Sequence, residues 1–386
     1  VGEPTVDLIR IAGLRRVSHR PVARQLGIPG GDRLTPRALR LARRHLADLP
    51  AVALSRVDYA PTGGGRADVV AGLAERTGLP DAPVPLAATA VRAAIYRELA
   101  LTAVSPLGLG ETWSGAWRWW EGRPGVSFAL AAPAGFGPPA VWRVAGEWER
   151  ETYELTNPVP QVPARERRTG ALVSSSMWLR PDLRGAVRLG FDRWDAAGGH
   201  FRGGLTGETR AAGDRLRLTL EADRWVSLDD GPGFATMEAR VEGTSRTRPE
   251  GVILSARAYV RGASSDAPTT LWPGAGTGIA RPDLLRAHPL LRDGAIAGRT
   301  FDRHLAGAGA EIVRWLAPNA LVRVGPAAFI DIAHAWGARA ATSLADAGLG
   351  IRLTTAAGGP VLRIDLATGL SDDDWALSAG WSGGGP

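Results

Sequence analysis

The residue types that most often carry enzyme chemistry are scarce or badly spaced in this chain. It has no Cys, which excludes a thiolate nucleophile, a disulfide framework, an iron–sulfur cluster and a zinc–thiolate site. None of the six His residues has a second His four positions away, the spacing that helical zinc sites use. A Gly-x-Ser-x-Gly nucleophile elbow is absent, and the Gly-rich stretch 274–278 lacks the Lys of a phosphate-binding loop. We therefore expect no catalytic residues, no metal and no cofactor.

The charged residues are numerous, but their distribution does not favour nucleic-acid binding. All 46 basic residues are Arg, and with 39 acidic residues they give a formal net charge of +7. Arg occurs from end to end and is interleaved with Asp and Glu, whereas a nucleic-acid binder usually concentrates its basic residues in one stripe. We expect no nucleic-acid partner.

Membrane-spanning helices are also not expected. No apolar run reaches the ~20 residues that such a helix requires. The chain opens at Val1 without a Met or an apolar leader, which leaves open whether a signal peptide has been removed or the chain is a fragment.

The first 78 residues have the pattern of a small α+β unit. Apolar residues predict a short strand at 6–11, and Ser18 and Thr35 stand where helix N-caps are expected. Two further strands are expected at Val52–Ala60 and Arg66–Leu73, joined by a Gly-rich turn. A Pro-rich segment, 79–85, then has the composition of a linker.

Period-two alternation dominates the rest of the chain. In 214–223, for example, Leu216, Leu218 and Leu220 alternate with charged or polar residues. A soluble β-sandwich also alternates, but it closes within about 100 to 250 residues, and here the pattern continues for roughly 300 with no helical cover. A transmembrane barrel explains an apolar outer face, a charged inner face and the restriction of all 14 Trp to 113–381. We expect an all-β transmembrane barrel of about 16 antiparallel strands, preceded by the α+β unit.

Three segments resemble a known family. The stretch Leu26-Gly27-Ile28-Pro29-Gly30, the turn Ser105–Glu111 and the alternating C-terminal strands 361–370 and 375–381 are similar to outer-membrane assembly factors of the BamA/TamA type, within the bacterial surface antigen family. In these proteins POTRA domains precede the barrel. The resemblance implies a periplasmic POTRA domain at 5–78, a linker at 79–85, an outer-membrane barrel at 86–381 with an inward-folded loop at 274–303, and a disordered tail at 382–386.

The resemblance also implies a loop-locking cluster in the lumen. In the family an Arg from the inward loop reaches carboxylates on neighbouring barrel strands. The best matches here are Arg292 for the loop, with Arg286 and Arg299 as alternatives, and Glu311 and Asp331 for the strands. A guanidinium facing two carboxylates in a partly desolvated lumen forms strong charge-assisted hydrogen bonds. The alternative is that these residues are separate solvated charges.

Two strand edges are expected to bind client proteins. One is the barrel seam, where a first strand at 91–104 meets the last strand; its candidate residues are Leu99, Leu101, Trp375, Leu377 and Trp381. The other is an exposed POTRA edge, with candidate residues Val52, Leu54, Val57 and Tyr59. The implied partners are unfolded outer-membrane or secreted clients, membrane lipids, and periplasmic chaperones or accessory lipoproteins.

The implied activity is insertion of β-barrel proteins into the outer membrane, or protein translocation across it. The alternatives are a dedicated secretion pore, the membrane anchor of a domain upstream of Val1, and a passive diffusion porin. Trp117, Trp119 and Trp120 are expected at the membrane interface.

Overall fold

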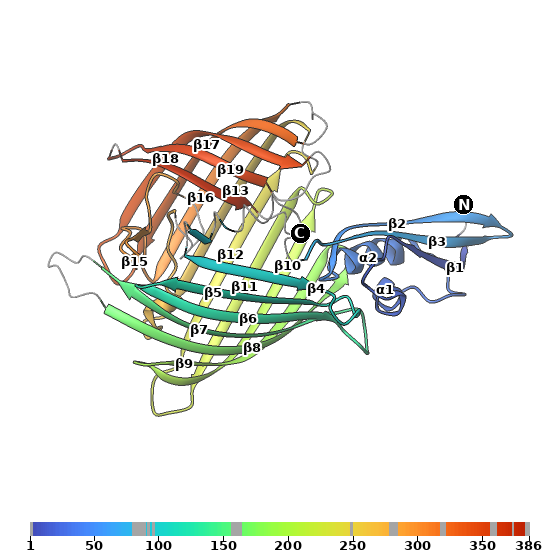
Figure 1. The fold of residues 1–386 in the computed structure, drawn as a ribbon, viewed down its shortest axis with the longest axis horizontal. Coiled ribbons are helices and arrows are strands. Elements are labelled where there is room, and N and C mark those ends of the chain that lie inside the picture. The colour runs from blue at the N-terminus through green and yellow to red at the C-terminus, as the bar shows by residue number, and fades with distance from the viewer. Residues whose placement is uncertain are drawn as a thin grey trace.

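The computed structural model describes residues 3–78, 90, 93–94, 97–155, 164–247, 250–277, 285–316, 322–355, 361–372 and 374–382. These residues form a small α+β unit beside one end of a large closed barrel (Figure 1). None of the helices in these ranges is long and apolar enough to cross a membrane. The expected linker and residues 383–386 of the expected tail lie outside the described residues.

The N-terminal unit has the predicted order of strand, two helices and two strands. Its elements are β1 (Thr5–Ala12), α1 (His19–Leu26), α2 (Pro36–Ala47), β2 (Val52–Gly63) and β3 (Arg66–Glu75). The sheet order is β1-β3-β2, with β1 parallel and β2 antiparallel to β3. Strand β2 therefore lies at an edge of the sheet.

Local sequence explains the helices of this unit. The Thr35 side chain accepts a hydrogen bond from the Ala38 N–H at 3.0 Å, and Pro36 occupies the first turn, where its missing N–H costs nothing. Helix α1 stops at Gly27, whose φ of 63° is left-handed. One face of each helix then contributes fully buried side chains such as Leu26 and Leu46 to the core against the sheet.

The barrel is an up-and-down meander of long strands. They are β4 (Glu98–Val104), β5 (Thr112–Trp120), β6 (Arg123–Pro133), β7 (Val141–Tyr153), β8 (Ala164–Arg180), β9 (Leu183–Trp194), β10 (Gly198–Ala211), β11 (Leu216–Ser227), β12 (Phe234–Thr244), β13 (Gly251–Ala263), β16 (His304–Trp315), β17 (Val322–Trp336), β18 (Thr342–Thr355), β19 (Val361–Gly369) and β20 (Trp375–Ser382). Within the described ranges this makes fifteen long strands, and the all-β barrel expected at about 16 strands is confirmed as an architecture. The expected first strand at 91–104 is described from Glu98 onward, and 91–92 and 95–96 lie outside the described residues.

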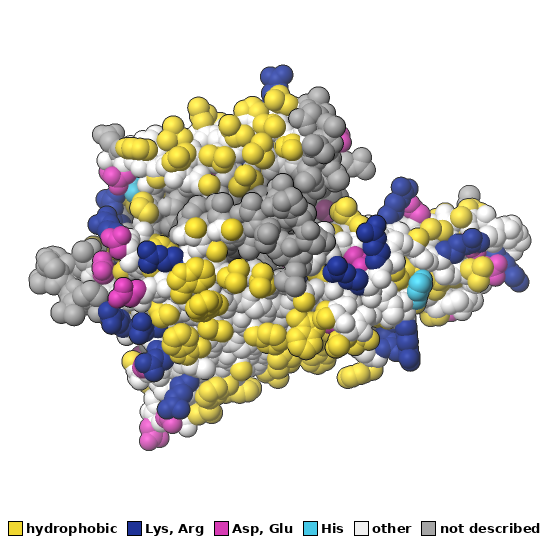
Figure 2. All heavy atoms as spheres, viewed as in Figure 1, with side chains coloured by type: hydrophobic (Ala, Val, Ile, Leu, Met, Phe, Trp, Pro, Cys, Tyr) yellow, Lys and Arg dark blue, Asp and Glu magenta, His cyan; other side chains and the backbone are white. Residues whose placement is uncertain are grey.

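The two faces of the barrel wall follow the period-two pattern. On β11, Leu216 and Leu220 are exposed on the outside, while Asp223 is buried on the inside between Arg188 and Arg202. Figure 2 shows hydrophobic side chains gathered over the outside of the barrel, with Arg and acidic residues at the end away from the N-terminal unit. An apolar exterior around a charged interior is what a lipid environment requires of a closed sheet.

Tryptophan has two locations rather than one. Trp117 and Trp119 are exposed on the outside of β5, as expected for an interfacial position. Trp194 and Trp225 are instead almost completely buried in the lumen, where both pack against Phe234. The Trp225 indole N–H donates to Asp192 at 2.7 Å, so the polar atom of this buried ring is satisfied.

The N-terminal unit is joined to the turns at one end of the barrel. The buried carboxylate of Asp48, at the end of α2, accepts the indole N–H of Trp178 at 2.9 Å and pairs with Arg184 at 3.0 Å. Arg44 donates to the Pro181 carbonyl at 2.8 Å, and Val104 belongs to the core of the N-terminal unit. These contacts hold the N-terminal unit against the barrel. One of them, the packing of Val104, is part of the hydrophobic core of that unit.

The joint predicts a measurable difference between two acidic residues. Asp48→Ala leaves Trp178 and Arg184 without their shared acceptor and should weaken protection of the α2 amides by about 1.5–3 kcal/mol in hydrogen exchange. Asp58→Ala, which removes an exposed surface pair with Arg43, is the matched control and should leave that protection unchanged. Equal exchange in the two variants would contradict this account of the joint.

Candidate functional site

The described parts of the segment between β13 and β16, residues 264–277 and 285–303, fold back into the barrel. They carry the short elements η1 (Thr269–Leu271), β14 (Leu291–Arg292) and β15 (Ala295–Ile296) (Figure 1). Their apolar side chains are enclosed; Leu285, Ile296 and Phe301 have no exposed surface. Ile296 pairs with Tyr153 on β7, and the ring of Tyr153 stacks on Phe301 with centroids 5.7 Å apart. The described residues of this loop therefore fill part of the lumen.

Arg286 is the centre of a buried ion cluster on the lumen wall. Its Nη1 lies 2.8 Å from Glu311 Oε2 on β16, and its Nε lies 3.1 Å from Asp331 Oδ2 on β17. Asp365 on β19 lies 3.4 Å from the same Nη1. The guanidinium also sits over the ring of Phe329, 3.8 Å from its centroid, which adds a cation–π contact. One loop residue thus contacts three barrel strands.

Arg352, on the inner face of β18, completes this network. It donates to Glu311 Oε1 at 2.9 Å and to Asp365 Oδ1 at 2.6 Å. Asp331 and Asp365 are almost completely buried, so the two guanidinium groups offset desolvation of three carboxylates. Each member of the cluster therefore depends on the others for charge compensation.

The structure corrects the assignment of the loop Arg. Glu311 and Asp331 both contact Arg286, whereas Arg292 is exposed on β14. The reason is local: Arg286 directly follows the fully buried Leu285, whereas Arg292 precedes the turn at Asp293-Gly294, both with positive φ. Arg299 contacts Asp372 instead.

Sequence reasoning missed Arg352, Asp365 and a buried histidine. Period-two alternation contains the signal for the first two, because Asp365 stands between outward-facing Ile364 and Leu366. His288 has no spacing motif. Its Nδ1 lies 2.6 Å from Asp346 on β18, and this carboxylate raises the pKa of His288 above its usual range although burial opposes the shift.

The predicted seam residues lie on the two shortest long strands of the barrel. Leu99 and Leu101 lie on β4, which has seven residues, and Trp375 and Leu377 lie on β20, which has eight. Leu101, Trp375 and Leu377 are exposed. Trp381 lies on β20 opposite Leu362.

The strand directions at the seam follow from the meander. Each neighbouring pair with a described register is antiparallel along the wall, so the first and last of the fifteen described strands run in the same direction. Parallel neighbours are slightly less stable per residue than antiparallel ones.

The predicted edge strand of the N-terminal unit is present, and its candidate residues differ in burial. Val52 and Val57 are buried in the core, whereas Leu54 and Tyr59 are exposed. In the sheet that the structure describes, β2 pairs with β3 on one side only, which leaves its other side as a sheet edge, and the Val57 carbonyl of β2 already accepts the Arg43 Nε–H at 2.7 Å.

The ion cluster predicts which Arg holds the loop. Arg286→Ala leaves Glu311, Asp331 and Asp365 with too little positive charge and should destabilise the packed loop by about 3–5 kcal/mol. The measurement is hydrogen exchange at Ala287, whose N–H donates to Asp346, and at Leu290, whose N–H donates to Thr277. Arg292→Ala is the matched control and should leave exchange unchanged; the reverse pattern would restore the sequence-based assignment.

Comparison with known proteins connects this architecture to two kinds of solved structure. No protein-family model and no curated protein matches the sequence. BamA from Haemophilus ducreyi, solved without POTRA domains 1–3, matches over 98% of this chain and 84% of its own, at 12% identity and a TM-score of 0.55. CdiB from Escherichia coli matches over 98% and 76%, at 14% identity and a TM-score of 0.60. CdiB from Acinetobacter baumannii matches over 98% and 73%, at 12% identity and a TM-score of 0.57. The chain therefore has the fold of BamA and CdiB, a small α+β unit followed by a closed β-barrel.

Proposed function

We propose that this protein is a bacterial outer-membrane barrel that inserts other β-barrel proteins into that membrane or moves proteins across it. In this proposal residues 5–78 form a periplasmic POTRA domain, 79–85 a linker and 86–382 the barrel, because β20 extends one residue beyond the expected end at 381, to Ser382. The shared fold and the apolar exterior of the wall support the location. The mechanism is non-covalent and requires no catalytic residue or cofactor.

The filled lumen argues against a passive porin. The loop buries Leu285, Leu290 and Ile296 inside the barrel and is held there by the Arg286 cluster. A diffusion pore instead keeps a water-filled channel through its lumen. The barrel wall, rather than an open bore, is therefore the better candidate for handling a client.

The observation that carries the proposal is the short seam. Strand β8 has 17 residues, whereas β4 and β20 have seven and eight, so few main-chain hydrogen bonds can close the barrel between them. Exposed Trp375 and Leu377 sit at this junction. Opening it would present two strand edges inside the membrane, and unpaired edges in lipid strongly favour pairing with an added strand.

The second client contact in the proposal is the free edge of β2. An extended client segment can add to this edge by main-chain hydrogen bonds, with Leu54 and Tyr59 exposed beside it. The unit is joined rigidly to the turn that follows β4, since the Ser18 N–H donates to the Gly108 carbonyl at 2.9 Å. A client captured at β2 is thus held on the side of the barrel where the first seam strand ends. Periplasmic chaperones or accessory lipoproteins would deliver clients to the same edge.

The alternative function is a dedicated secretion pore, and one observation favours it. A cavity of about 460 Å³ lies in the lumen between the ion cluster and the barrel end near the N-terminal unit. Charged residues from several strands line it, including Arg217, Glu242 and Arg257. A polar cavity that is closed on one side by a movable loop is the arrangement expected of a gated channel.

Reconstitution separates the two functions. Vesicles containing the protein should accelerate membrane insertion of an added unfolded small barrel protein, read as protease protection of that client, while their ionic conductance stays low and intermittent. Empty vesicles provide the control. Steady conductance with no effect on the client would reject the insertion function in favour of a pore.

Locking the seam tests the mechanism. Because the chain has no Cys, Leu99→Cys combined with Leu377→Cys or a neighbouring position of β20 gives a single engineered disulfide. Both residues lie near the beginning of strands that run in the same direction. Client insertion should fall to background when the bond forms and return on reduction.

A disulfide elsewhere in the wall provides the control for this variant. Leu205 and Ala222 are direct partners on β10 and β11, away from the seam, and the double Cys variant at these positions should retain activity when oxidised. Undiminished insertion with the seam bond formed would rule out lateral opening.

A further inference from the structure

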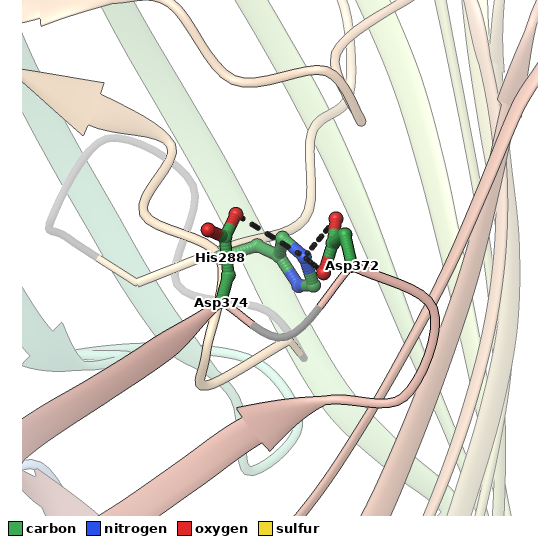
Figure 3. Close-up of side chains that lie close together, drawn as sticks. All are labelled: His288, Asp372 and Asp374. Carbon is green, nitrogen blue, oxygen red and sulfur yellow. Dashed lines mark hydrogen bonds and ion pairs between the residues drawn. The ribbon is translucent and has the colours of Figure 1, made fainter.

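Three side chains from the lumen loop and the last hairpin point toward one another at the barrel end opposite the N-terminal unit. Figure 3 shows the imidazole of His288 between the carboxylates of Asp372 and Asp374. His288 belongs to the loop, and the two Asp residues flank the turn between β19 and β20. One potential ligand atom from each residue lies within 4.8 Å of the others.

The spacing of these atoms matches a small divalent metal. His288 Nε2 lies 3.0 Å from Asp372 Oδ1 and 3.9 Å from Asp374 Oδ2. Ligand atoms about 2.05 Å from a tetrahedral Zn²⁺ are separated by about 3.3 Å. These two separations fall on both sides of this value, and the remaining pair of ligand atoms lies within 4.8 Å.

A residue outside the three orients the imidazole. Asp346 on β18 accepts the Ala287 N–H through Oδ2 at 2.6 Å, which fixes the carboxylate, and its Oδ1 lies 2.6 Å from His288 Nδ1. With Nδ1–H donating to Asp346, the other ring nitrogen, Nε2, faces Asp372 at 3.0 Å, and a metal ion bound at Nε2 would take the place of a proton at that nitrogen. A carboxylate behind a ligating His is the usual outer partner of protein zinc sites.

The charge around His288 also favours a cation. Asp346, Asp372 and Asp374 carry three negative charges, and Arg299, which contacts Asp372 Oδ2, supplies one positive charge. With His288 neutral, the group has a net charge of −2, which one divalent ion neutralises. Asp374 is more than half exposed, so an ion can enter from solution.

The backbone of β19 leaves space for this arrangement. A Cβ added at Gly369 would lie 3.0 Å from His288 Cε1 and would collide with Asp372 Oδ1. Glycine at this position therefore allows the imidazole and the carboxylate to lie together against the end of the strand.

We propose that His288, Asp372 and Asp374 bind one divalent transition metal ion of the Zn²⁺ class, with water as the remaining ligand. Asp346 and Arg299 orient the ligands without binding the ion. The metal fastens the lumen loop to the hairpin that leads into β20. This inference concerns the outer end of the barrel and holds whether the protein inserts clients or secretes them.

Cobalt substitution tests the site directly. The full-length protein in detergent, free of any affinity tag and stripped with EDTA, is titrated with Co²⁺; four-coordinate Co²⁺ gives a visible absorption band far more intense than that of the hydrated ion. We expect one equivalent to bind and Zn²⁺ to displace it. His288→Gln and Asp372→Asn should each remove the band, and Asp346→Asn should weaken binding by about 10–100-fold.

His334→Gln provides the matched control. His334 is exposed on β17 and lies 2.7 Å from the Ser343 hydroxyl, so its loss should leave the band and the stoichiometry unchanged. Heat-modifiable migration in electrophoresis verifies that each variant keeps a folded barrel. As a second measurement, Zn²⁺ should raise the melting temperature of the wild type and the His334→Gln variant but not of His288→Gln. No stoichiometric band in the wild type, or a band that survives His288→Gln, would overturn the proposal.

Discussion

The structure depends on the neutralisation of one buried guanidinium. Arg286 has little exposed surface, and a cation in that position is tolerable only when carboxylates surround it. The carboxylates come from β16, β17 and β19, and they in turn require the positive charge of Arg286 and Arg352. Moving the loop out of the lumen would separate Arg286 from its carboxylate partners. The guanidinium and the carboxylates on the barrel strands would then each lose a neutralising charge. We therefore expect the loop to enter or leave the lumen as one unit, because a partly displaced loop would leave these charges unpaired.

The strands of the barrel wall differ in length and in the number of ion pairs that link them. The strands from β7 to β11 have 12 to 17 residues, and charged inner side chains such as Asp223, Arg188 and Arg202 link successive strands across the lumen face. The seam strands are about half as long. In lipid, where water cannot replace a lost main-chain hydrogen bond, the number of paired residues decides which joint opens at the lowest free-energy cost. For the lateral opening proposed above, the candidate is the joint between β4 and β20, where at most seven residues of β4 can pair and the two strands run in the same direction.

Sequence patterns predicted the elements better than the contacts between them. Period two gave the barrel strands because each wall residue faces either lipid or lumen, and Thr35-Pro36 marked the start of α2 through local capping chemistry. The identity of the loop Arg could not be derived, because it depends on how Leu285 is buried and how the turn at Asp293-Gly294 orients its neighbours. The His288 group was missed for a similar reason: its Asp residues lie 58 to 86 positions after His288 in the chain and meet it only once the loop enters the lumen.

The contacts at the two ends of the barrel bear on which strand would move in the proposed opening of the seam. Strand β4 ends at Val104, which is part of the core of the N-terminal unit, and the following turn contacts that unit through Gly108 and Gly110. Moving β4 would therefore disturb a packed core. In the part of the chain that the structure describes, β20 is supported by β19 along its length and by the His288 group near its first residues. If the seam opens, β20 and β19 swing away while β4 stays with the N-terminal unit. The position of the lumen loop then controls the mobile edge, because Arg286 holds β19 through Asp365 and His288 holds the hairpin that joins β19 to β20.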